Sequence, residues 1–524
     1  MQKNAWERGT LRRKSGHEVP LSRALFCMGE GNLTLALTPQ SPYLFQIRKH
    51  NMKKPVLLLI TLLASQNIAH AANLLEVYQQ AQCSDPIFQQ AIAQRLATKE
   101  GVPISAAALL PNIQFTATPS VSRIGYSGSN YDPVVTGGEA FLNPRNLTEK
   151  TSVLNLTVTQ TVFNFAQFST VAQQVSLSKA ADATLNAALQ NLMIRVSSAY
   201  FAVLQDEDNL TAAVASKEAY TEQLDQIRRQ YKVGLKTLTD VYTAQASYDS
   251  AVATYIQAET TLANDRENLR VITGVYYPKL SSLSDEFPLI SPQPSDIEIW
   301  VRRALMQNWT IKSSQCNAAA ARENIRQQEA GHLPYASVQT TFVKTTTDNI
   351  NDYLSFSERR GPGTLSDRTL QLNFTVPIFS GGAVVAETRQ AKYNYQVAMQ
   401  QLEQTTRNTI NTTRQSYLGI IAGISKINAD KEAIKSSISS LEGFEASYSV
   451  GTETLVDVLN QQQKVYQAQT QYAADRYAFV NNVLALKQAA GTLGFEDLCA
   501  INAWLITEKK PYAYHKHHRK KIKI

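Results

Sequence analysis

The chain has 524 residues, only 22 glycines and 18 prolines, and a formal net charge of +8. Long stretches rich in Ala, Gln, Ser and Thr with few helix breakers favour long helices. The positive charge lies at the two ends, because residues 1–71 and 508–524 together hold 17 Lys/Arg and 4 Asp/Glu. The remaining 34 basic and 39 acidic residues give no electrostatic basis for nucleic-acid binding, so no nucleic-acid partner is predicted.

Residues 52–71 have the features of a secretory signal peptide. Two lysines precede a short apolar core, and the sequence AHA that ends at Ala71 fits a small-x-small cleavage site. We therefore interpret residues 1–51 as a mis-assigned N-terminal extension, the alternative being a disordered leader. We interpret residues 508–524 as a basic disordered tail. No later run of 18 apolar residues follows, so contact with a membrane is expected through strands or the surface.

A tandem repeat organises the rest of the chain. The stretch YKVGLKTLTDV at 231–241 recurs as YSVGTETLVDV at 448–458. Each half holds, in the same order, a helix, a Leu-Pro break, two strands joined by a loop, a long helix, the glycine motif and another helix. The predicted repeats cover 72–274 and 297–491, with a linker at 275–296 between them and an end segment at 492–507.

Four segments alternate apolar and polar residues in the manner of barrel strands. In LQLNFTV at 370–376 every even-numbered residue is apolar and every odd-numbered one is polar. The pattern fits a wall with lipid on one face and water on the other, although a half-buried sheet in a soluble sandwich gives the same alternation. Four strands are too few to close a barrel, so several chains must share one. The predicted strands are 112–125, 151–163, 335–348 and 368–379.

Two very long helical hairpins are predicted at 166–273 and 383–490. The first helix of the earlier hairpin holds no proline or glycine before its glycine motif, and after each motif apolar residues recur with a period of 3.5. Helices of this kind pair, so each hairpin is expected to be an antiparallel coiled coil. Gly234 and Gly451 then supply the left-handed backbone conformation at the two tips.

These features together resemble the TolC family of outer membrane factors. The resemblance is carried by LLP at 109–111, HLP at 332–334, LNFTVPIFSGG at 372–382 and the two glycine motifs in duplicated order. It implies an α+β membrane protein in which a homotrimer forms a 12-stranded β-barrel, four strands per chain. A long α-helical coiled-coil tunnel continues this barrel into the periplasm. The expected location is therefore the cell outer membrane, in contact with outer membrane lipid and extending into the periplasm.

The resemblance also implies a function. Members of the family are passive exit channels of tripartite drug efflux pumps and of type I protein secretion. A periplasmic adaptor (membrane fusion) protein and an inner-membrane transporter of the RND, ABC or MFS type open them. The linker at 275–296 and the end segment at 492–507 correspond to the equatorial belt of such a tunnel.

A pore constriction is expected at the second hairpin tip. In the family, an aspartate pair one helical turn apart forms a narrow ring there. The first position of the pair corresponds to Asp457, whereas the second holds Asn460. A trimer would carry three carboxylates at this level instead of six, which weakens the field on passing cations. The alternative role of Asp457 is that of a carboxylate at a helix start, facing the positive end of the helix dipole.

Latches between neighbouring hairpins are expected close by. The resemblance implies that Tyr448 donates a hydrogen bond to Asp240, and it assigns Thr239 to the same latch. Glu453 stands where the family has an arginine, and a glutamate cannot donate to Thr239 or Asp240. Either Lys236 pairs with Glu453, or this gate is less firmly latched. The residues expected to form the tips and to dock the adaptor are Gly234, Leu235, Gly451 and Thr452.

Two other classes of function were compared with the channel. A soluble periplasmic coiled-coil scaffold or adaptor would share the helices, but the alternating strands and their loops argue against it. An enzyme is not predicted, because no nucleophile–base pair, metal-ligand spacing or phosphate-binding loop is visible. No catalytic residue, metal site or cofactor is therefore assigned.

Overall fold

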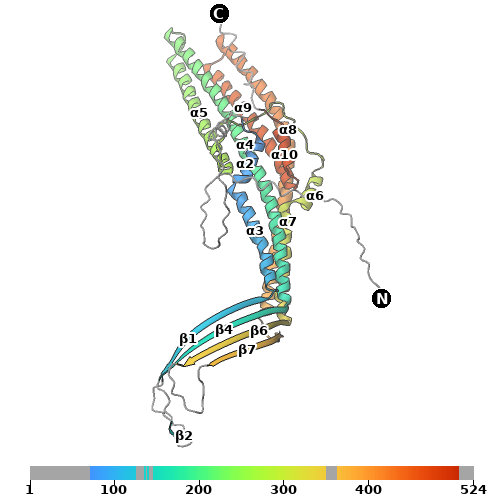
Figure 1. The fold of residues 1–524 in the computed structure, drawn as a ribbon. Helices are drawn as coiled ribbons and strands as arrows, with labels where there is room; N and C mark the ends of the chain where they lie inside the picture. Colours follow the sequence, from blue (N-terminus) through green and yellow to red (C-terminus); the bar gives the residue numbers. More distant parts are fainter. Residues whose placement is uncertain (1–70, 126–134, 137–138, 141–145, 350–362, 507–524) are drawn as a thin grey trace, which may run out of the picture. The chain divides into compact units, whose positions relative to one another are not determined.

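The computed structural model describes residues 71–506, apart from 126–134, 137–138, 141–145 and 350–362 (Figure 1). The predicted extension at 1–51, the predicted signal peptide except Ala71, and the predicted tail at 508–524 lie outside the described residues. These three predictions therefore stay predictions.

The first half of the chain contains helices on either side of two long strands. Its elements are α2 (Leu74–Ser84), α3 (Pro86–Ala107), β1 (Asn112–Gly125), β4 (Asn146–Phe163), α4 (Phe165–Lys232) and α5 (Leu238–Thr273), with the short pair β2 (Val135–Thr136) and β3 (Glu139–Ala140).

The second half repeats this order. Its elements are α6 (Ile297–Gln307), α7 (Trp309–Glu329), the 3₁₀ turn η2 (Ala330–His332), β6 (Tyr335–Asn349), β7 (Gly363–Thr375), α8 (Ala383–Ser449) and α9 (Leu455–Ala489). The chain continues with α10 (Phe495–Asn502) and ends its described part with β8 (Leu505–Ile506), which pairs with β5 (Ser282–Leu283).

The structure corrects the prediction of a single helix before the strands of each repeat. Two helices stand there in both halves, because a capping residue interrupts each predicted helix. Asp85 accepts a hydrogen bond from the backbone of Phe88 at 2.8 Å and precedes Pro86. In the second half, Asn308 ends α6 and caps α7. A short polar side chain at such a position replaces a missing backbone partner, so the helix restarts in a new direction.

Two strand boundaries also differ from the predictions. β7 ends at Thr375, not at residue 379, because Pro377 has no backbone N–H to donate to a ladder. β7 also begins five residues earlier than predicted, and β4 begins at Asn146 instead of residue 151. The long strands thus reach further toward the loops than the alternating pattern indicated.

The four long strands form one antiparallel sheet in the order β1-β4-β6-β7. The central pair, β4 and β6, joins the two repeats, with Leu156 opposite Phe342. β1 and β7 are edge strands, each hydrogen-bonded to a neighbour on one side within the chain. Figure 1 shows that the four strands curve together.

The long helices pack as two antiparallel hairpins, α4 with α5 and α8 with α9. α4 also contacts α3, α7 and α9, so it is a central helix of the bundle (Figure 1). By length and composition alone, one stretch of α4 could cross a membrane, and it is the one such helix among the described residues. Half of that stretch is buried inside the protein, which is the environment expected of a core helix.

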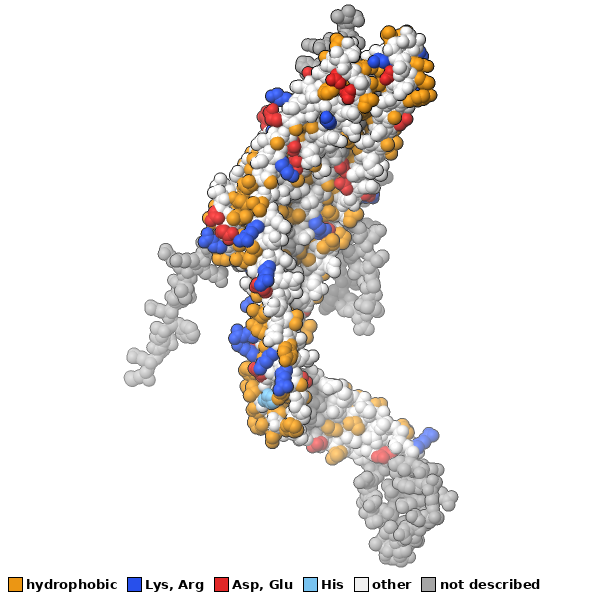
Figure 2. Space-filling view, turned by 180° about the vertical axis from the view of Figure 1, so that it is seen from behind, with side chains coloured by type: hydrophobic (Ala, Val, Ile, Leu, Met, Phe, Trp, Pro, Cys, Tyr) orange, Lys and Arg blue, Asp and Glu red, His pale blue; other side chains and the backbone are white. Residues whose placement is uncertain are grey.

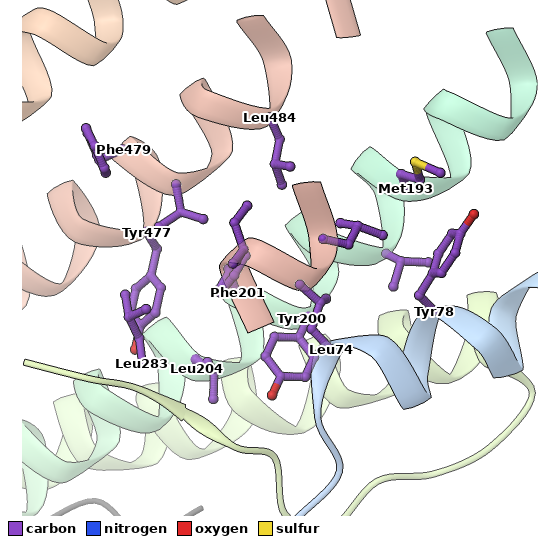
Figure 3. Close-up of a cluster of buried hydrophobic side chains, with 14 of the residues drawn as sticks. Leu74, Tyr78, Met193, Tyr200, Phe201, Leu204, Leu283, Tyr477, Phe479 and Leu484 are labelled. Carbon is purple, nitrogen blue, oxygen red and sulfur yellow. The ribbon is translucent and has the colours of Figure 1, made fainter. Parts of the chain in front are cut away.

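The main core lies where α2, α4, α9, α10 and the segment containing β5 meet. Figure 3 shows side chains from these elements converging, and many are large and aromatic. The hydroxyl of Tyr200 donates hydrogen bonds to the carbonyls of Ala72 and Ser281, at 3.2 and 2.7 Å. A buried tyrosine satisfied in this way adds apolar area without leaving its polar group unpaired. The residues labelled in Figure 3 are Leu74, Tyr78, Met193, Tyr200, Phe201, Leu204, Leu283, Tyr477, Phe479 and Leu484.

The segment between the repeats is fixed to this core by a buried arginine. Arg476 of α9 is fully buried and donates to the carbonyls of Leu283 and Ser284, at 3.2 and 2.9 Å. It also forms an ion pair with Asp285 at 3.2 Å. Because β5 pairs with β8, the linker and the end segment are held together at one level of the helical bundle.

Candidate channel gate and membrane wall

The two glycine motifs are sharp turns between antiparallel helices. Gly234 has φ +80° and Gly451 has φ +84°, the left-handed region that glycine adopts without strain. At the first tip the N–H groups of Gly234 and Leu235 donate to the carbonyls of Tyr231 and Gln230, both at 2.9 Å. The same bonds recur at Gly451 and Thr452. This 5→2 and 6→1 pairing is the Schellman ending of a helix, which explains the repeated glycine.

Both aspartates of the predicted gate cap the helix that follows the turn. Asp240 and Asp457 are the third residues of α5 and α9, and each forms a capping box with a threonine, Thr237 and Thr454. Hydrogen bonds from the backbone N–H of Thr237 lower the pKa of Asp240. The hydroxyl and the backbone of Thr454 lower that of Asp457. Both carboxyls are therefore charged at neutral pH.

Tyr448 contacts the other hairpin tip through its ring. The ammonium of Lys236 lies 4.2 Å from the centroid of the Tyr448 ring, a cation–π contact between the two turns of one chain. The phenol oxygen of Tyr448 is buried and has no hydrogen-bond partner among the described residues. Within the chain, then, the ring of Tyr448 is engaged, while its buried hydroxyl is left without a hydrogen-bond partner.

The other predicted gate and tip residues lie on the surface of the chain. Thr239, Glu453 and Asn460 are exposed, and Asn460 follows Asp457 by one helical turn. Leu235 is 72% exposed at the first tip. Sequence reasoning considered Lys236 as a partner of Glu453 and missed its contact with Tyr448, since no local pattern relates residues 212 positions apart.

The two tips of one chain share a small apolar core. Tyr220 and Leu224 of α4 pack with Leu455 and Leu459 of α9, and the Tyr220 hydroxyl donates to the Leu459 carbonyl at 3.2 Å. A largely polar cavity of about 720 Å³ remains between the tips. It is lined by residues that include Gln226, Gln230, Lys236, Tyr448 and Gln462. The tips are thus coupled to each other but not tightly packed.

The sheet has one apolar and one polar face. Residues directly opposite each other in an antiparallel ladder share a face, so the register defines rows across the four strands. One row consists of Ile113, Val158, Thr340 and Leu370, and the next of Phe115, Leu156, Phe342 and Arg368. The rows between them are polar, for example Gln114, Thr157, Thr341 and Thr369.

The apolar face is also the more exposed one. Along β6, even-numbered residues from Phe342 to Asp348 are exposed and the odd-numbered ones between them are half-buried, as on the convex and concave sides of a curved sheet. Leu370 is 74% exposed and Phe115 is 65% exposed. Large apolar side chains directed away from the chain's own core need another apolar environment.

Exposed apolar side chains also gather where the helices join the strands. Figure 2 shows hydrophobic side chains on the surface at this junction. Ile378 and Phe379, which follow β7, are the most exposed large apolar residues of the described chain, and Phe163 and Tyr335 lie at strand ends nearby. Aromatic residues at the border of an apolar band are typical of membrane barrels.

Metal chemistry has no support among the residues that the structure describes. In that part of the chain no group of three or more His, Cys, Asp or Glu side chains is arranged to hold a metal ion.

Comparison with known proteins identifies the family. Residues 77–275 and 300–492 match the family described as outer membrane efflux protein, in two segments that correspond to the two repeats. The chain belongs to the outer membrane efflux protein family. It is 35% identical to the outer membrane protein TolC of Escherichia coli over 462 residues, which cover 86% of this chain and 89% of TolC.

More distant relatives extend the comparison. The chain is 27% identical to the alkaline protease secretion protein AprF of Pseudomonas aeruginosa over 452 residues, covering 86% of this chain and 91% of AprF. Its fold matches the Campylobacter jejuni CmeC outer membrane channel with a TM-score of 0.65 at 19% identity, over 80% of this chain and 86% of that one.

These findings confirm the resemblance and the fold class inferred from the sequence. This outer membrane efflux protein is located in the bacterial outer membrane and extends into the periplasm. It is an exit channel of the class that serves efflux and type I secretion. Its relatives are channel proteins and not enzymes, and the family argues against the soluble scaffold considered above.

Proposed function

We propose that three copies of the chain close one 12-stranded barrel, continued by a helical tunnel that is gated at the hairpin tips. The observation that carries this proposal is the four-stranded sheet with an outward apolar face and two open edges, β1 and β7. An unpaired strand edge in lipid costs several kcal/mol per backbone group, so the edges must pair between chains. Four strands cannot close alone, whereas twelve can.

The partners follow from the two ends of this assembly. The apolar rows of the barrel contact outer membrane lipid. In the periplasm, the hairpin tips dock a periplasmic adaptor protein that connects the channel to an inner-membrane transporter of the RND, ABC or MFS type. Gly234, Leu235, Gly451 and Thr452 form the docking turns, and the exposed apolar side chain of Leu235 supports this role.

The gate has a charged ring and a latch. Asp457 of three chains supplies three carboxylates, and the exposed Asn460 lies one turn further along α9. The free phenol of Tyr448 closes the gate by donating to Asp240, beside Thr239, of a neighbouring hairpin. Glu453 does not replace the family's arginine. Lys236, which covers the Tyr448 ring, supplies the positive charge at the tips instead.

The test of this function is ion conduction by the purified mature protein in planar bilayers. We expect a small, cation-selective conductance. Asp457→Ala should lower and Asn460→Asp should raise the cation-to-anion permeability ratio, each by roughly two- to fivefold at low salt, because the ring then holds zero or six carboxylates instead of three.

An exposed carboxylate on the helix before the second turn provides the matched control. Glu442→Ala removes a charge from an exposed position of α8 and should leave selectivity unchanged. If Asp457→Ala and Asn460→Asp both behave like Glu442→Ala, the proposed ring is wrong. The absence of any conductance from the wild-type protein would contradict the channel itself.

A further inference from the structure

The charged residues of the sheet are divided between its two faces. On the apolar, convex face each long strand carries one basic residue, and the polar face carries Glu149 and Asp367 and no basic residue within the described strands. Asp348 is the one acid on the convex face of these strands. The four basic residues are Arg123 of β1, Lys150 of β4, Lys344 of β6 and Arg368 of β7, and all four are exposed.

These basic residues lie at the loop end of the apolar band. Arg368 is directly opposite Phe342, in the last row that contains aromatic side chains, and Lys344 is opposite Leu154 in the following row. Lys150 stands two rows further, roughly 13 Å along the strand at 3.3 Å per residue. Figure 2 shows Lys or Arg side chains at this end of the sheet. The helix end of the convex face carries apolar residues instead.

Lys344 and Arg368 are diagonal neighbours on adjacent strands, because Lys344 is opposite Ser366. Diagonal residues on one face are about 7–8 Å apart, so two cations there repel each other unless an anion lies between them. Neither residue has an ion-pair partner among the described residues, whereas Lys150 has Asp348 directly opposite. A phosphate group between an ammonium and a guanidinium would satisfy both charges.

We propose that Lys344 and Arg368, with Lys150 and Arg123 beyond them, bind the phosphate groups of lipopolysaccharide in the outer leaflet. This inference rests on the proposed barrel, because it takes the convex face as the lipid side. The helices extend into the periplasm, so the loop end of the strands borders the outer leaflet. Lys344 and Arg368 form a lower tier, and Lys150 and Arg123 form an upper tier. Two tiers of basic residues fit a lipid with phosphates at more than one depth. A phospholipid with a single phosphate engages only the lower tier.

The experiment measures the apparent melting temperature of the purified protein in neutral detergent as lipid is added. Lipopolysaccharide should raise it, and phosphatidylcholine and inorganic phosphate should not. For Lys344→Gln/Arg368→Gln the half-saturating lipopolysaccharide concentration should rise about tenfold, as expected for the loss of charge-assisted hydrogen bonds. The control Lys431→Gln/Lys464→Gln removes the same charge from exposed helix positions and should titrate like the wild type.

Several results would overturn the proposal. They are an unchanged titration of the double variant and of both single variants, equal stabilisation by phosphatidylcholine, or equal stabilisation by inorganic phosphate. Equal stabilisation by phosphatidylglycerol would reduce the site to a general anionic-lipid contact and refute the choice of lipopolysaccharide. Conductance of the double variant in phosphatidylcholine bilayers separates this inference from the channel, since that conductance should persist whether or not lipopolysaccharide binds.

Discussion

At the scale of single residues, the hairpin tips combine structural and gating roles. Asp457 caps α9 and Asp240 caps α5 through threonine hydroxyl and backbone groups, so these carboxylates are needed for the turn even without a neighbouring chain. The Tyr448 ring, in contrast, caps neither helix: it contacts Lys236 of the far tip and packs against the two small apolar clusters of the tips. The residues that link the tips can therefore be changed without breaking either helix start.

Lys236→Met should loosen the closed gate. The substitution keeps the aliphatic stem and removes a cation–π contact of about 0.5–1 kcal/mol, so the open fraction in bilayers should rise by roughly two- to fivefold per chain. Tyr448→Phe retains this contact and removes only the hydroxyl. If the latch is the hydrogen bond to Asp240 of a neighbour, Tyr448→Phe opens the gate as well. Should neither variant alter the open fraction, Tyr448 is not part of the latch.

A buried carboxyl in the first hairpin makes stability depend on pH. Burial, together with the nearby charge of Asp265, raises the pKa of Asp206 to about 6. Asp206 is 8% exposed, and one of its oxygens has no hydrogen-bond partner among the described residues. The folded state therefore binds a proton more tightly than the unfolded state. Protonation of Asp206 therefore stabilises the folded state. This contribution is complete below about pH 4 and is lost as the pH rises through about 6.

Asp206→Asn should remove this effect. The neutral amide resembles the protonated acid, so the variant should melt at a higher temperature than the wild type at pH 7.5 and at the same temperature at pH 4. Apparent melting temperatures at the two pH values provide the measurement. A variant that melts lower than the wild type at pH 7.5 would show that the ionised carboxylate is stabilising, contrary to its surroundings.

Sequence reasoning reached some of these residues and not others. The glycines and the aspartates belong to a motif written twice, so local chemistry placed them at a turn, but it did not single out Thr237 and Thr454 as caps. The contact of Lys236 with Tyr448 and the burial of Asp206 arise only when separate helices pack. The same holds for Arg476, a fully buried anchor for the linker.

At the scale of elements, each hairpin depends on one left-handed residue. Gly451→Ala should destabilise the second tip by about 1–2 kcal/mol, because alanine at φ +84° brings its Cβ close to the following carbonyl. Gly443 lies inside α8 in open space with ordinary helical φ, so Gly443→Ala should stabilise by up to about 1 kcal/mol. Amide hydrogen exchange in 444–458 measures both effects. Equal exchange in the two variants would contradict the role of the turn.

The strands illustrate what alternation can and cannot predict. Apolar residues at every second position of β7 predicted one lipid face, and the register places them in rows with apolar residues of β4 and β6. The pattern could not give the strand ends, where Pro377 stops the ladder, nor the convex basic residues. Those residues become a group only when four strands are aligned.

At the scale of the whole molecule, the proposed channel depends on closure between chains. A single chain exposes an apolar face, which lipid covers in the proposed barrel, and two strand edges, which only further copies can pair. The four alternating strands predicted that several chains share one barrel, and the family resemblance implied three chains and twelve strands. The channel for cargo and the gate at the hairpin tips both require that closure.

Cross-linking of β1 to β7 tests the closure most directly. Cysteine pairs, one at 114–118 and one at 369–373, are placed in a background with serine in place of the native cysteines and are oxidised in the outer membrane. We expect covalent species of two and three chains and none larger, because a ring of three is closed. A ladder that extends beyond three chains, or a bond within one chain only, would contradict the barrel.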